Sequence, residues 1–315
     1  MTERNRAILA LRPTRRTVFH WVLGLAAGLR PVVAAAAPPE MLTRPIPRSN
    51  EPLPVVGLGT AINFDIGDNA EKRAALAAVL RTLADGGGKL VDTASSYGSA
   101  ESVLGQLFAE TGLRQKLFVA SKVEARELAD PPAALDRALQ RLRSERLELM
   151  MLHNVSRPEE SLAAMRQWQS GGTVRYLGIS TSSVRDFEAV EAVMRREKPD
   201  FLEVNYSLGD REAEKRLLPA AAELGIAVMA DLPFGRGRLF RAVGGRTLPE
   251  WAGEFDAASW AQFFLKYLIA HPAVTAVIPG TAEPEHMRDN LGAGRGRLPD
   301  AAQRRHMVEF FDSLG

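Results

Sequence analysis

Residues 89–98 read KLVDTASSYG, a short apolar run that ends at Asp92 and opens into a polar loop. An apolar run of this length, bounded by glycine and serine, is typical of a buried β-strand. Similar runs recur on both sides of it along most of the chain. The expected strands are Val55–Gly59, Lys89–Asp92, Leu117–Ser121, Leu147–Leu152, Tyr176–Ser180, Phe201–Val204, Ala227–Ala230 and Thr275–Ile278.

Longer amphipathic stretches separate these strands. Their apolar residues recur at three- to four-residue intervals, which predicts helices. The expected helices include Glu71–Ala84, Pro132–Arg143, Glu159–Gln169, Val184–Arg195, Arg211–Leu224 and Ala257–Ala270. We expect Asp68 and Asp210 to begin two of them and Gly225 to end one, because these residue types cap helices.

The alternation of strands and helices predicts βαβ units and a parallel sheet. Eight strands of this kind indicate an α/β fold, a closed (β/α)8 TIM barrel over residues 54–315. The alternative is an open doubly wound sheet, which carries a glycine-rich phosphate loop after its first strand. The stretch Gly57–Thr60 lacks the third glycine and the helix start of that motif, so the barrel is favoured.

The composition excludes several classes of function. The chain has no cysteine, which excludes disulfides, thiolate chemistry and Cys-based zinc sites. Its net charge of +2 hides an asymmetry, because residues 1–37 carry six arginines against one acid, Glu3. The rest of the chain has 34 basic and 37 acidic side chains and is mildly acidic. The basic patch expected of a nucleic-acid-binding protein is therefore missing from the body of the chain, and no nucleic-acid partner is expected.

The first 37 residues are predicted to be a cleavable signal peptide. An apolar run, Val18–Leu29, follows several arginines and precedes the small residues Ala34–Ala37, which is the order found in secretory signals. The run is too short to span a membrane. The adjacent Arg15 and Arg16 are similar to the twin-arginine (Tat) motif.

We therefore expect the Tat export machinery as a partner and a periplasmic or otherwise exported location. The mature protein would begin near Pro38, with residues 38–53 as an extended segment ahead of the barrel. A disordered basic tail is the alternative for residues 1–37.

Four polar residues follow or end three consecutive predicted strands. Asp92 ends one strand, Tyr97 lies in the loop after it, Lys122 follows the next strand and His153 follows the one after that. In a barrel, the C-terminal ends of the strands form the rim at which active sites are built. Each residue taken singly is more often a surface charge, a helix cap or a packed side chain. Their joint placement predicts a catalytic site.

These residue types suit the reduction of a carbonyl group. Hydride addition leaves an alkoxide that needs a proton donor, and Tyr97 is a general acid of the right kind. We expect the ammonium of Lys122 to lower the pKa of Tyr97, with Asp92 holding Lys122 in place. His153 would donate a hydrogen bond to the substrate oxygen.

The stretch Val91–Glu101, followed by Leu104 and Gly105, resembles the signature of the aldo-keto reductase superfamily. The likeness covers about Pro54 to Asn290, and it continues in order through Ala120–Val123, Leu152–Asn154, Gly178–Ser180 and Val277–Gly280. It implies a nicotinamide-dependent reductase of aldehydes or ketones, with Asp92, Tyr97, Lys122 and His153 as the catalytic tetrad. Segments similar to those of Tat-exported members are Arg211–Glu214, Leu217–Pro219 and Pro233–Phe234.

The resemblance also implies an extended NADPH, with NADH as the alternative, across the mouth of the barrel. Ser180 and Thr181 fall where the nicotinamide carboxamide is held, although Asn is usual at the second position. Residues Pro233–Arg238 would line the pyrophosphate, with a flexible basic surface loop as the alternative. The full set of expected cofactor residues is Gly59, Thr60, Ser180, Thr181, Glu203, Asp231, Pro233, Phe234, Gly235, Gly237, Gly280, Thr281, His286 and Asn290.

Four of these positions depart from the family pattern. Gly280 and His286 stand where members selective for NADP often carry Lys and Arg, so we expect weak discrimination between NADP and NAD. Glu203 replaces a common Gln, and Asp231 stands where many members stack an aromatic ring. Our hypothesis is that these two acids stabilise the oxidised ring; the alternative is that one or both face away from it.

The sequence leaves two alternative functions to compare with carbonyl reduction. A non-catalytic nicotinamide-binding or regulatory protein is possible, because a fold does not dictate a function. A metal-dependent hydrolase would need several His, Asp or Glu ligands on different strands, and only His153 is suitably placed, so no metal is expected. The expected substrate is a small carbonyl compound. Candidate pocket residues are Ile62, Phe64, Trp251 and Phe255, with surface packing as the alternative.

Overall fold

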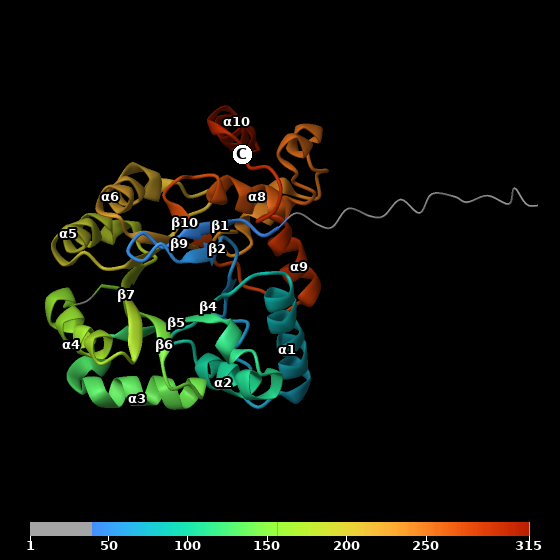
Figure 1. Ribbon diagram of the computed structural model, residues 1–315. Coiled ribbons are helices and arrows are strands. Elements are labelled where there is room, and N and C mark those ends of the chain that lie inside the picture. Colours follow the sequence, from blue (N-terminus) through green and yellow to red (C-terminus); the bar gives the residue numbers. More distant parts are fainter. Residues whose placement is uncertain (1–39, 156, 315) are drawn as a thin grey trace, which may run out of the picture. The chain divides into compact units, whose positions relative to one another are not determined.

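The structure is a computed structural model of the full chain, and it describes residues 40–155 and 157–314 (Figure 1). The predicted signal peptide, residues 1–37, lies outside the described residues. Within them, no helix combines the length and apolar character that a membrane crossing requires.

Eight parallel strands of the described residues form the predicted (β/α)8 barrel (Figure 1). They follow chain order around the barrel, so that each strand pairs with the next. Backbone bridges between Val56 and Val277 and between Gly59 and Gly280 bring the first and last strands together. The strands are β3 Leu58–Gly59, β4 Leu90–Asp92, β5 Phe118–Glu124, β6 Leu147–His153, β7 Val174–Thr181, β8 Phe201–Asn205, β9 Ala227–Asp231 and β10 Val274–Val277.

This meeting of β3 and β10 requires a glycine. Gly59 N donates to the carbonyl oxygen of Pro279 at 3.1 Å. A Cβ atom at position 59 would lie 2.8 Å from the carbonyl oxygen of Ile278, closer than real side chains approach. The glycine thus allows two backbones to come together where the sheet closes.

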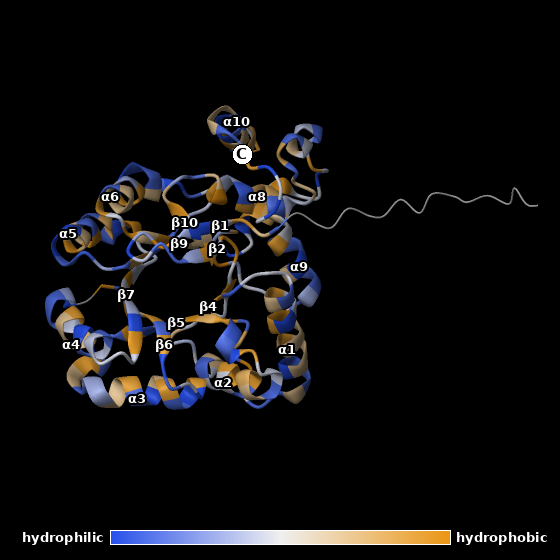
Figure 2. Ribbon diagram, viewed as in Figure 1, coloured by the Kyte–Doolittle hydropathy of each residue, from blue (hydrophilic) through white to orange (hydrophobic). Residues whose placement is uncertain are grey.

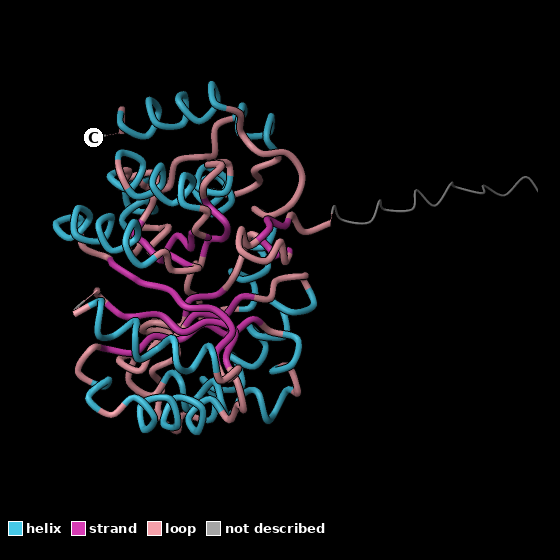
Figure 3. The backbone as a smooth tube through the Cα atoms, turned by 60° about the vertical axis from the view of Figure 1, so that its left-hand side comes forward, coloured by secondary structure: helices cyan, strands magenta, loops and turns pink. Residues whose placement is uncertain are grey.

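Helices follow most strands and surround the barrel (Figures 1 and 3). Hydrophobic and hydrophilic residues alternate along them (Figure 2). In α3 the buried residues are Ala134, Leu135, Ala138 and Leu142, a spacing that places them on one face of the helix. The helices are α1 Ala70–Asp85, α2 Ala100–Thr111, α3 Pro131–Leu142, α4 Pro158–Ser170, α5 Phe187–Glu197, α6 Leu217–Leu224, α7 Arg238–Val243, α8 Trp260–Ile269, α9 Pro284–Gly292 and α10 Ala301–Asp312.

Two of the three expected helix caps differ from the prediction. Asn69, not Asp68, caps α1, and its side chain accepts from Lys72 N. Asp210 instead accepts a hydrogen bond from Asn205 Nδ2 at 2.9 Å, so it holds the loop after β8. Gly225 ends α6 in the left-handed conformation, as predicted.

Part of the segment predicted to be extended is an antiparallel hairpin, β1 Thr43–Pro45 with β2 Pro52–Pro54. Its residues Ile46 and Leu53 are buried in the same apolar cluster as Leu90 and Phe118, the first residues of β4 and β5. The hairpin therefore closes the N-terminal end of the barrel and leaves the opposite end to the polar residues.

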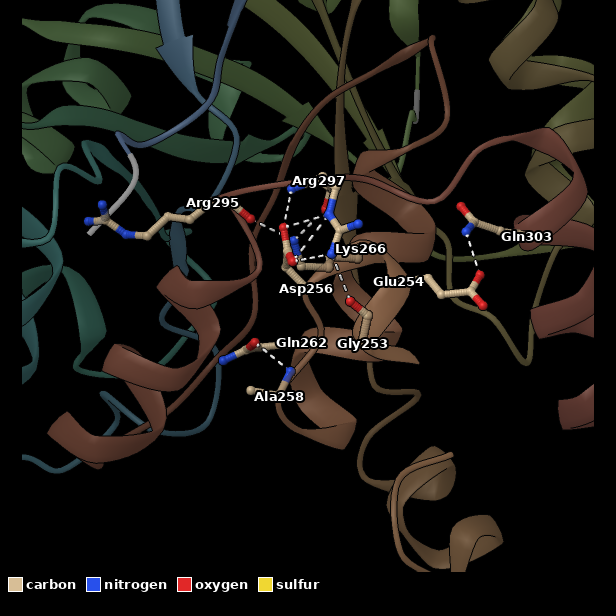
Figure 4. A network of polar contacts seen from close by, with 9 residues as sticks. All are labelled: Gly253, Glu254, Asp256, Ala258, Gln262, Lys266, Arg295, Arg297 and Gln303. Carbon is tan, nitrogen blue, oxygen red and sulfur yellow. Dashed lines mark hydrogen bonds and ion pairs between the residues drawn. The ribbon is translucent and has the colours of Figure 1, made fainter. Parts of the chain in front are cut away.

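The segment between α9 and α10 is held by a buried lysine of α8 (Figure 4). Lys266 Nζ donates to the carbonyl oxygens of Arg295, at 2.6 Å, and Arg297, at 2.8 Å. The guanidinium of Arg297 in turn pairs with Asp256 at 2.7 Å. Burial lowers the pKa of Lys266 to about 8. The ammonium thus replaces lost water contacts with backbone carbonyls.

Candidate active site

Asp92, Lys122 and Tyr97 form a hydrogen-bonded cluster at the C-terminal end of the barrel. Lys122 Nζ lies 2.7 and 2.6 Å from the two carboxylate oxygens of Asp92 and 3.2 Å from the hydroxyl of Tyr97. It also donates to the carbonyl oxygen of Thr93 at 3.1 Å. The side chain of Lys122 is fully buried. The structure brings the three predicted residues together, and their catalytic role stays a prediction.

The two-residue repeat of a strand explains why these side chains meet. Successive side chains of a strand alternate between its faces, so the residue two positions after an inward-facing one also faces the barrel interior. Five strands have, at or near their C-terminal ends, an apolar interior residue followed two positions later by a polar one. The pairs are Leu90 and Asp92, Ala120 and Lys122, Met151 and His153, Phe201 and Glu203, and Met229 and Asp231.

Tyr97 comes from the loop between β4 and α2, which is fixed by a second loop. Asp65 accepts hydrogen bonds from Ser99 N at 2.9 Å and Ser99 Oγ at 2.8 Å. The next residue after Tyr97, Gly98, has a left-handed backbone with φ of 57° and lies against Asp65. The loop after β3 thereby helps to orient the tyrosine.

The pKa of Tyr97 is raised rather than lowered. Burial is the largest cause; the charge of Lys122 lowers the pKa, and the charges of Asp92 and Glu203 raise it. Lys122 thus lowers the pKa of Tyr97 as expected, but burial and two carboxylates outweigh this effect, so the net shift is upward. Tyr97 keeps its proton throughout the neutral pH range.

His153 lies beside Tyr97, with the two rings perpendicular and their centroids 6.0 Å apart. Burial and the charge of Lys122 lower the pKa of His153 to about 4. The imidazole is therefore neutral at physiological pH, and one of its nitrogens is a donor. Its Nδ1 lies 3.2 Å from Ser96 Oγ.

The two acids that depart from the family pattern are both close to the cluster. Glu203 Oε2 lies 3.2 Å from Lys122 Nζ, and burial raises the pKa of Glu203 well above its usual range. Burial also raises the pKa of Asp231 to about 7, against the charge of Lys122. Glu203 therefore approaches the lysine; stabilisation of an oxidised ring by either acid stays a prediction.

Two predicted cofactor residues and one neighbour that was not predicted have polar atoms that suit a nucleotide. The side-chain oxygens of Thr60, Ser180 and Asn205 are buried and have no hydrogen-bond partner within the described residues. Buried polar groups are normally paired, so orphaned atoms beside a site indicate a missing ligand. Thr181 differs, because its hydroxyl accepts from Ser183 N at 3.2 Å and stabilises the turn after β7.

The predicted pyrophosphate loop follows β9 and borders a pocket of about 310 Å³. Gly235, Arg236, Arg238 and Ser207 are among its lining residues. Gly235 and Gly237 have left-handed backbones, and Gly237 precedes α7. Pro233 is buried, while Phe234 packs on Phe240 with ring centroids 4.9 Å apart. Glycines and arginines in one loop fit an anionic ligand.

The predicted adenosine end lies at β10 and α9. Thr281 Oγ1 accepts from Glu283 N at 3.0 Å, next to the start of α9. Asn290 is buried within that helix and His286 is exposed on it. Arg288 is occupied by an ion pair with Glu285. Gly280 has Gly59 and Asn63 as neighbours, which places it at the seam of the barrel.

The candidate pocket residues do not lie together. Phe64 and Phe255 are fully buried in the core, and Trp251 packs on His306 of α10 with centroids 4.4 Å apart. Ile62 alone of the four is exposed, at 78%, and its φ of 67° is unusual for a β-branched residue. For the other three, core or surface packing is the better interpretation.

Sequence analysis missed two features of the site. Ser96 stands within the quoted signature, but its contact with His153 depends on how the loop after β4 folds. Asn205 is the last residue of β8, in an inward position two residues after Glu203, and the strand alternation alone was sufficient to include it.

The sequence profile of the aldo/keto reductase family matches residues 55–305, which covers the barrel and every site residue above. The chain belongs to the aldo/keto reductase family. Methylglyoxal reductase YeaE of Escherichia coli is 33% identical over 256 residues, covering 79% of this chain and 88% of that protein. The family and this relative identify the protein as an oxidoreductase that reduces carbonyl compounds.

Solved structures agree with the family. An aldo/keto reductase from Klebsiella pneumoniae in complex with NADP and acetate has a TM-score of 0.71 at 28% identity, covering 83% of this chain and 93% of that one. The thermostable aldo-keto reductase Tm1743, in complex with the inhibitor epalrestat, has a TM-score of 0.71 at 27% identity, covering 87% of this chain and all of that one.

Proposed function

We propose that this protein reduces a small aldehyde or ketone to an alcohol with NADPH as the hydride source and Tyr97 as the general acid. The observation that carries the proposal is the buried cluster in which Lys122 Nζ lies 2.6 Å from Asp92 and 3.2 Å from Tyr97. An ammonium, a carboxylate and a phenol in this order fit proton donation to a developing alkoxide.

The cofactor fits the residues present. When bound, NADPH supplies the hydride that the carbonyl carbon accepts. Ser180 and Asn205 have orphaned oxygens for the carboxamide end, and Arg236 and Arg238 of the loop Pro233–Arg238 supply cations for the pyrophosphate. NADH stays a candidate, because Gly280 and His286 provide no pair of cations for a 2′-phosphate.

Each side chain of the cluster then has a separate role at the substrate oxygen. Tyr97 donates its proton to that oxygen as negative charge develops there, and a raised pKa keeps the proton on the tyrosine until then. Lys122 stabilises the tyrosinate that is left. Asp92 keeps Lys122 charged and in place through two hydrogen bonds. Neutral His153 donates a second hydrogen bond to the same oxygen.

The experiment is a cofactor titration followed by turnover. Binding of NADPH and NADH to residues 38–315 is measured by fluorescence, and cofactor oxidation is then followed with a panel of aldehydes and ketones that includes methylglyoxal. We expect turnover in the wild type and at least about a hundredfold loss in Tyr97→Phe with cofactor binding retained. Binding without turnover for any carbonyl compound would favour the alternative, a non-catalytic nicotinamide-binding protein.

We also propose that the protein is exported by the Tat route to the periplasm or another exported location. Support comes from Arg15 and Arg16 ahead of the apolar run Val18–Leu29. Export in the folded state suits an enzyme that acquires its nucleotide before crossing the membrane. The absence of cysteine also suits an oxidising compartment.

A further inference from the structure

Lys122 is shared by two carboxyl groups that come from different strands. Asp92, at the end of β4, accepts hydrogen bonds from Nζ with both of its oxygens. Glu203, on β8, places Oε2 3.2 Å from the same Nζ as an ion pair, without a hydrogen bond to any described residue. All three side chains are at most 5% exposed. The catalytic cluster therefore contains one more acid than the tetrad.

The local charges do not balance if every group is ionised. Asp92, Glu203 and Asp231 surround one ammonium, and burial raises the pKa of all three acids. The charges of Asp92 and Asp231 raise the pKa of Glu203 further, while the charge of Lys122 lowers it. When carboxyl groups lie close together where water cannot solvate every charge, one of them keeps a proton.

Glu203 is oriented toward the lysine rather than toward open space. Its neighbours across the sheet are Ser180 on β7 and Met229 on β9, yet its carboxyl group contacts Lys122 of β5. The side chain thus reaches across the end of the barrel. A residue that only contacted the cofactor would not need to pair with Lys122.

We propose that Glu203 is a positioning residue that keeps Tyr97 protonated into the alkaline range by competing with it for the charge of Lys122. As the pH rises, the proton that this group of acids retains leaves before the proton of Tyr97. The additional negative charge then opposes ionisation of Tyr97. This inference rests on the proposed reductase function, because it assigns a direction to that reaction.

The charged and titratable groups around Tyr97 support this order of events. Lys122 on β5 favours tyrosinate, while Asp92 on β4 and Glu203 on β8 oppose it. His153 on β6 faces the tyrosine ring and is neutral above a pH of about 4. Asp231 on β9 acts on Glu203 and is not among the charges that act on Tyr97.

The consequence is that the site favours carbonyl reduction over alcohol oxidation. Carbonyl reduction uses the phenol form of Tyr97, which would be present at all physiological pH values. Alcohol oxidation begins from tyrosinate, which would form only at strongly alkaline pH. Removing the charge of Glu203 should move the titration of Tyr97 down by at least about one pH unit, since a unit charge in a poorly solvated site has an effect of this size.

The test is a spectrophotometric tyrosinate titration of the protein without cofactor. Wild type, Glu203→Gln and Asp231→Asn are each titrated, and the signal of the same protein with Tyr97→Phe is subtracted, so that Tyr176, Tyr206 and Tyr267 cancel. We expect Tyr97 of Glu203→Gln to ionise at least about one unit below the wild type, and Asp231→Asn and Glu203→Asp to behave as the wild type. Equal titrations of wild type and Glu203→Gln would overturn the proposal.

A second measurement covers the case in which Glu203→Gln does not fold. The carboxyl stretching band of a protonated acid is recorded by infrared spectroscopy in Asp231→Asn, in which Asp92 and Glu203 are the remaining acids of the cluster. We expect that band to persist at neutral pH and disappear at alkaline pH. A spectrum without it at neutral pH contradicts the retained proton and overturns the proposal.

Turnover separates this inference from the proposed function. For a folded Glu203→Gln, we expect the alkaline pKa of alcohol oxidation to fall by about one unit, which gives an oxidation rate about tenfold higher at a fixed pH below it. A shifted tyrosinate titration without any turnover would disprove the reductase function and its direction. Normal turnover with an unshifted titration would disprove only the role of Glu203.

Discussion

Ser96 Oγ lies 3.2 Å from Nδ1 of His153, whose ring lies beside that of Tyr97. A hydroxyl that donates to Nδ1 leaves the proton of the neutral imidazole on Nε2, the nitrogen that can then donate to a substrate oxygen. The serine hydroxyl is thus placed to select the tautomer of the histidine.

Replacing Ser96 with Ala should weaken that selection. We expect kcat to fall about fivefold, the equivalent of ~1 kcal/mol for one hydrogen bond, with little change in KM. Nitrogen NMR of His153 should show a larger fraction of the other tautomer. Ser96→Thr, which keeps a hydroxyl, is the matched control and should retain both kcat and the tautomer. A normal tautomer in Ser96→Ala would disprove the selection.

The lowered pKa of His153 predicts a pH dependence of stability. Its folded-state pKa of about 4 lies below the ordinary value of 6.5, so the unfolded chain binds the proton more strongly between these values. Stability contributed by neutral His153 is therefore present above pH 6.5 and is lost as the pH falls toward 4.

His153→Asn should remove this loss of stability at low pH. Between pH 7.5 and pH 5, we expect the free energy of unfolding of the wild type to drop by about 1 kcal/mol more than that of the variant, after allowing for solvent screening of the half-buried ring. Urea denaturation at the two pH values measures the difference. His306→Asn, at an exposed position of α10, is the control and should behave as the wild type. Equal losses in wild type and His153→Asn would count against the buried neutral imidazole.

Lys266 predicts a structural effect away from the active site. Lys266→Met keeps most of the side-chain volume but removes the donor to the carbonyl oxygens of Arg295 and Arg297. We expect a loss of about 1–3 kcal/mol in the free energy of unfolding, because buried acceptors are left unpaired. Denaturation with urea measures this loss, and Tyr97-dependent turnover should persist at temperatures at which the variant is folded. A variant as stable as the wild type would show that these contacts contribute little.

The export proposal predicts a change of location. Arg15→Lys combined with Arg16→Lys should retain the protein in the cytoplasm, because the receptor reads the paired arginines. Cell fractionation and the apparent mass of the chain distinguish retained precursor from exported mature protein. Arg4→Lys with Arg6→Lys changes the same residue types outside the pair and should leave export intact. Continued export of the Arg15 and Arg16 variant would refute the Tat route.

The sequence by itself determined the barrel, because strand and helix periodicities are local properties of the chain. The placement of Asp92 and His153 at strand ends, and of Lys122 near one, was also readable, since alternation along a strand fixes which residues face inward. Residues 147–153 illustrate this, as the apolar run and its terminal histidine form one strand, β6. The cofactor residues named from the family likeness depend on the motif rather than on periodicity.

Tertiary structure alone decided the charge state of the site. That Glu203 and Asp92 both lie against Lys122 depends on how strands far apart in sequence meet at one end of the barrel. The direction of the pKa shift of Tyr97 follows from that meeting, because burial and charge act through space and leave no periodic pattern in the sequence. The hairpin at Thr43–Pro54 was missed because contacts with other parts of the fold determine it. The cap at Asn69 was missed because the adjacent Asp68 is an equally suitable capping residue in the sequence.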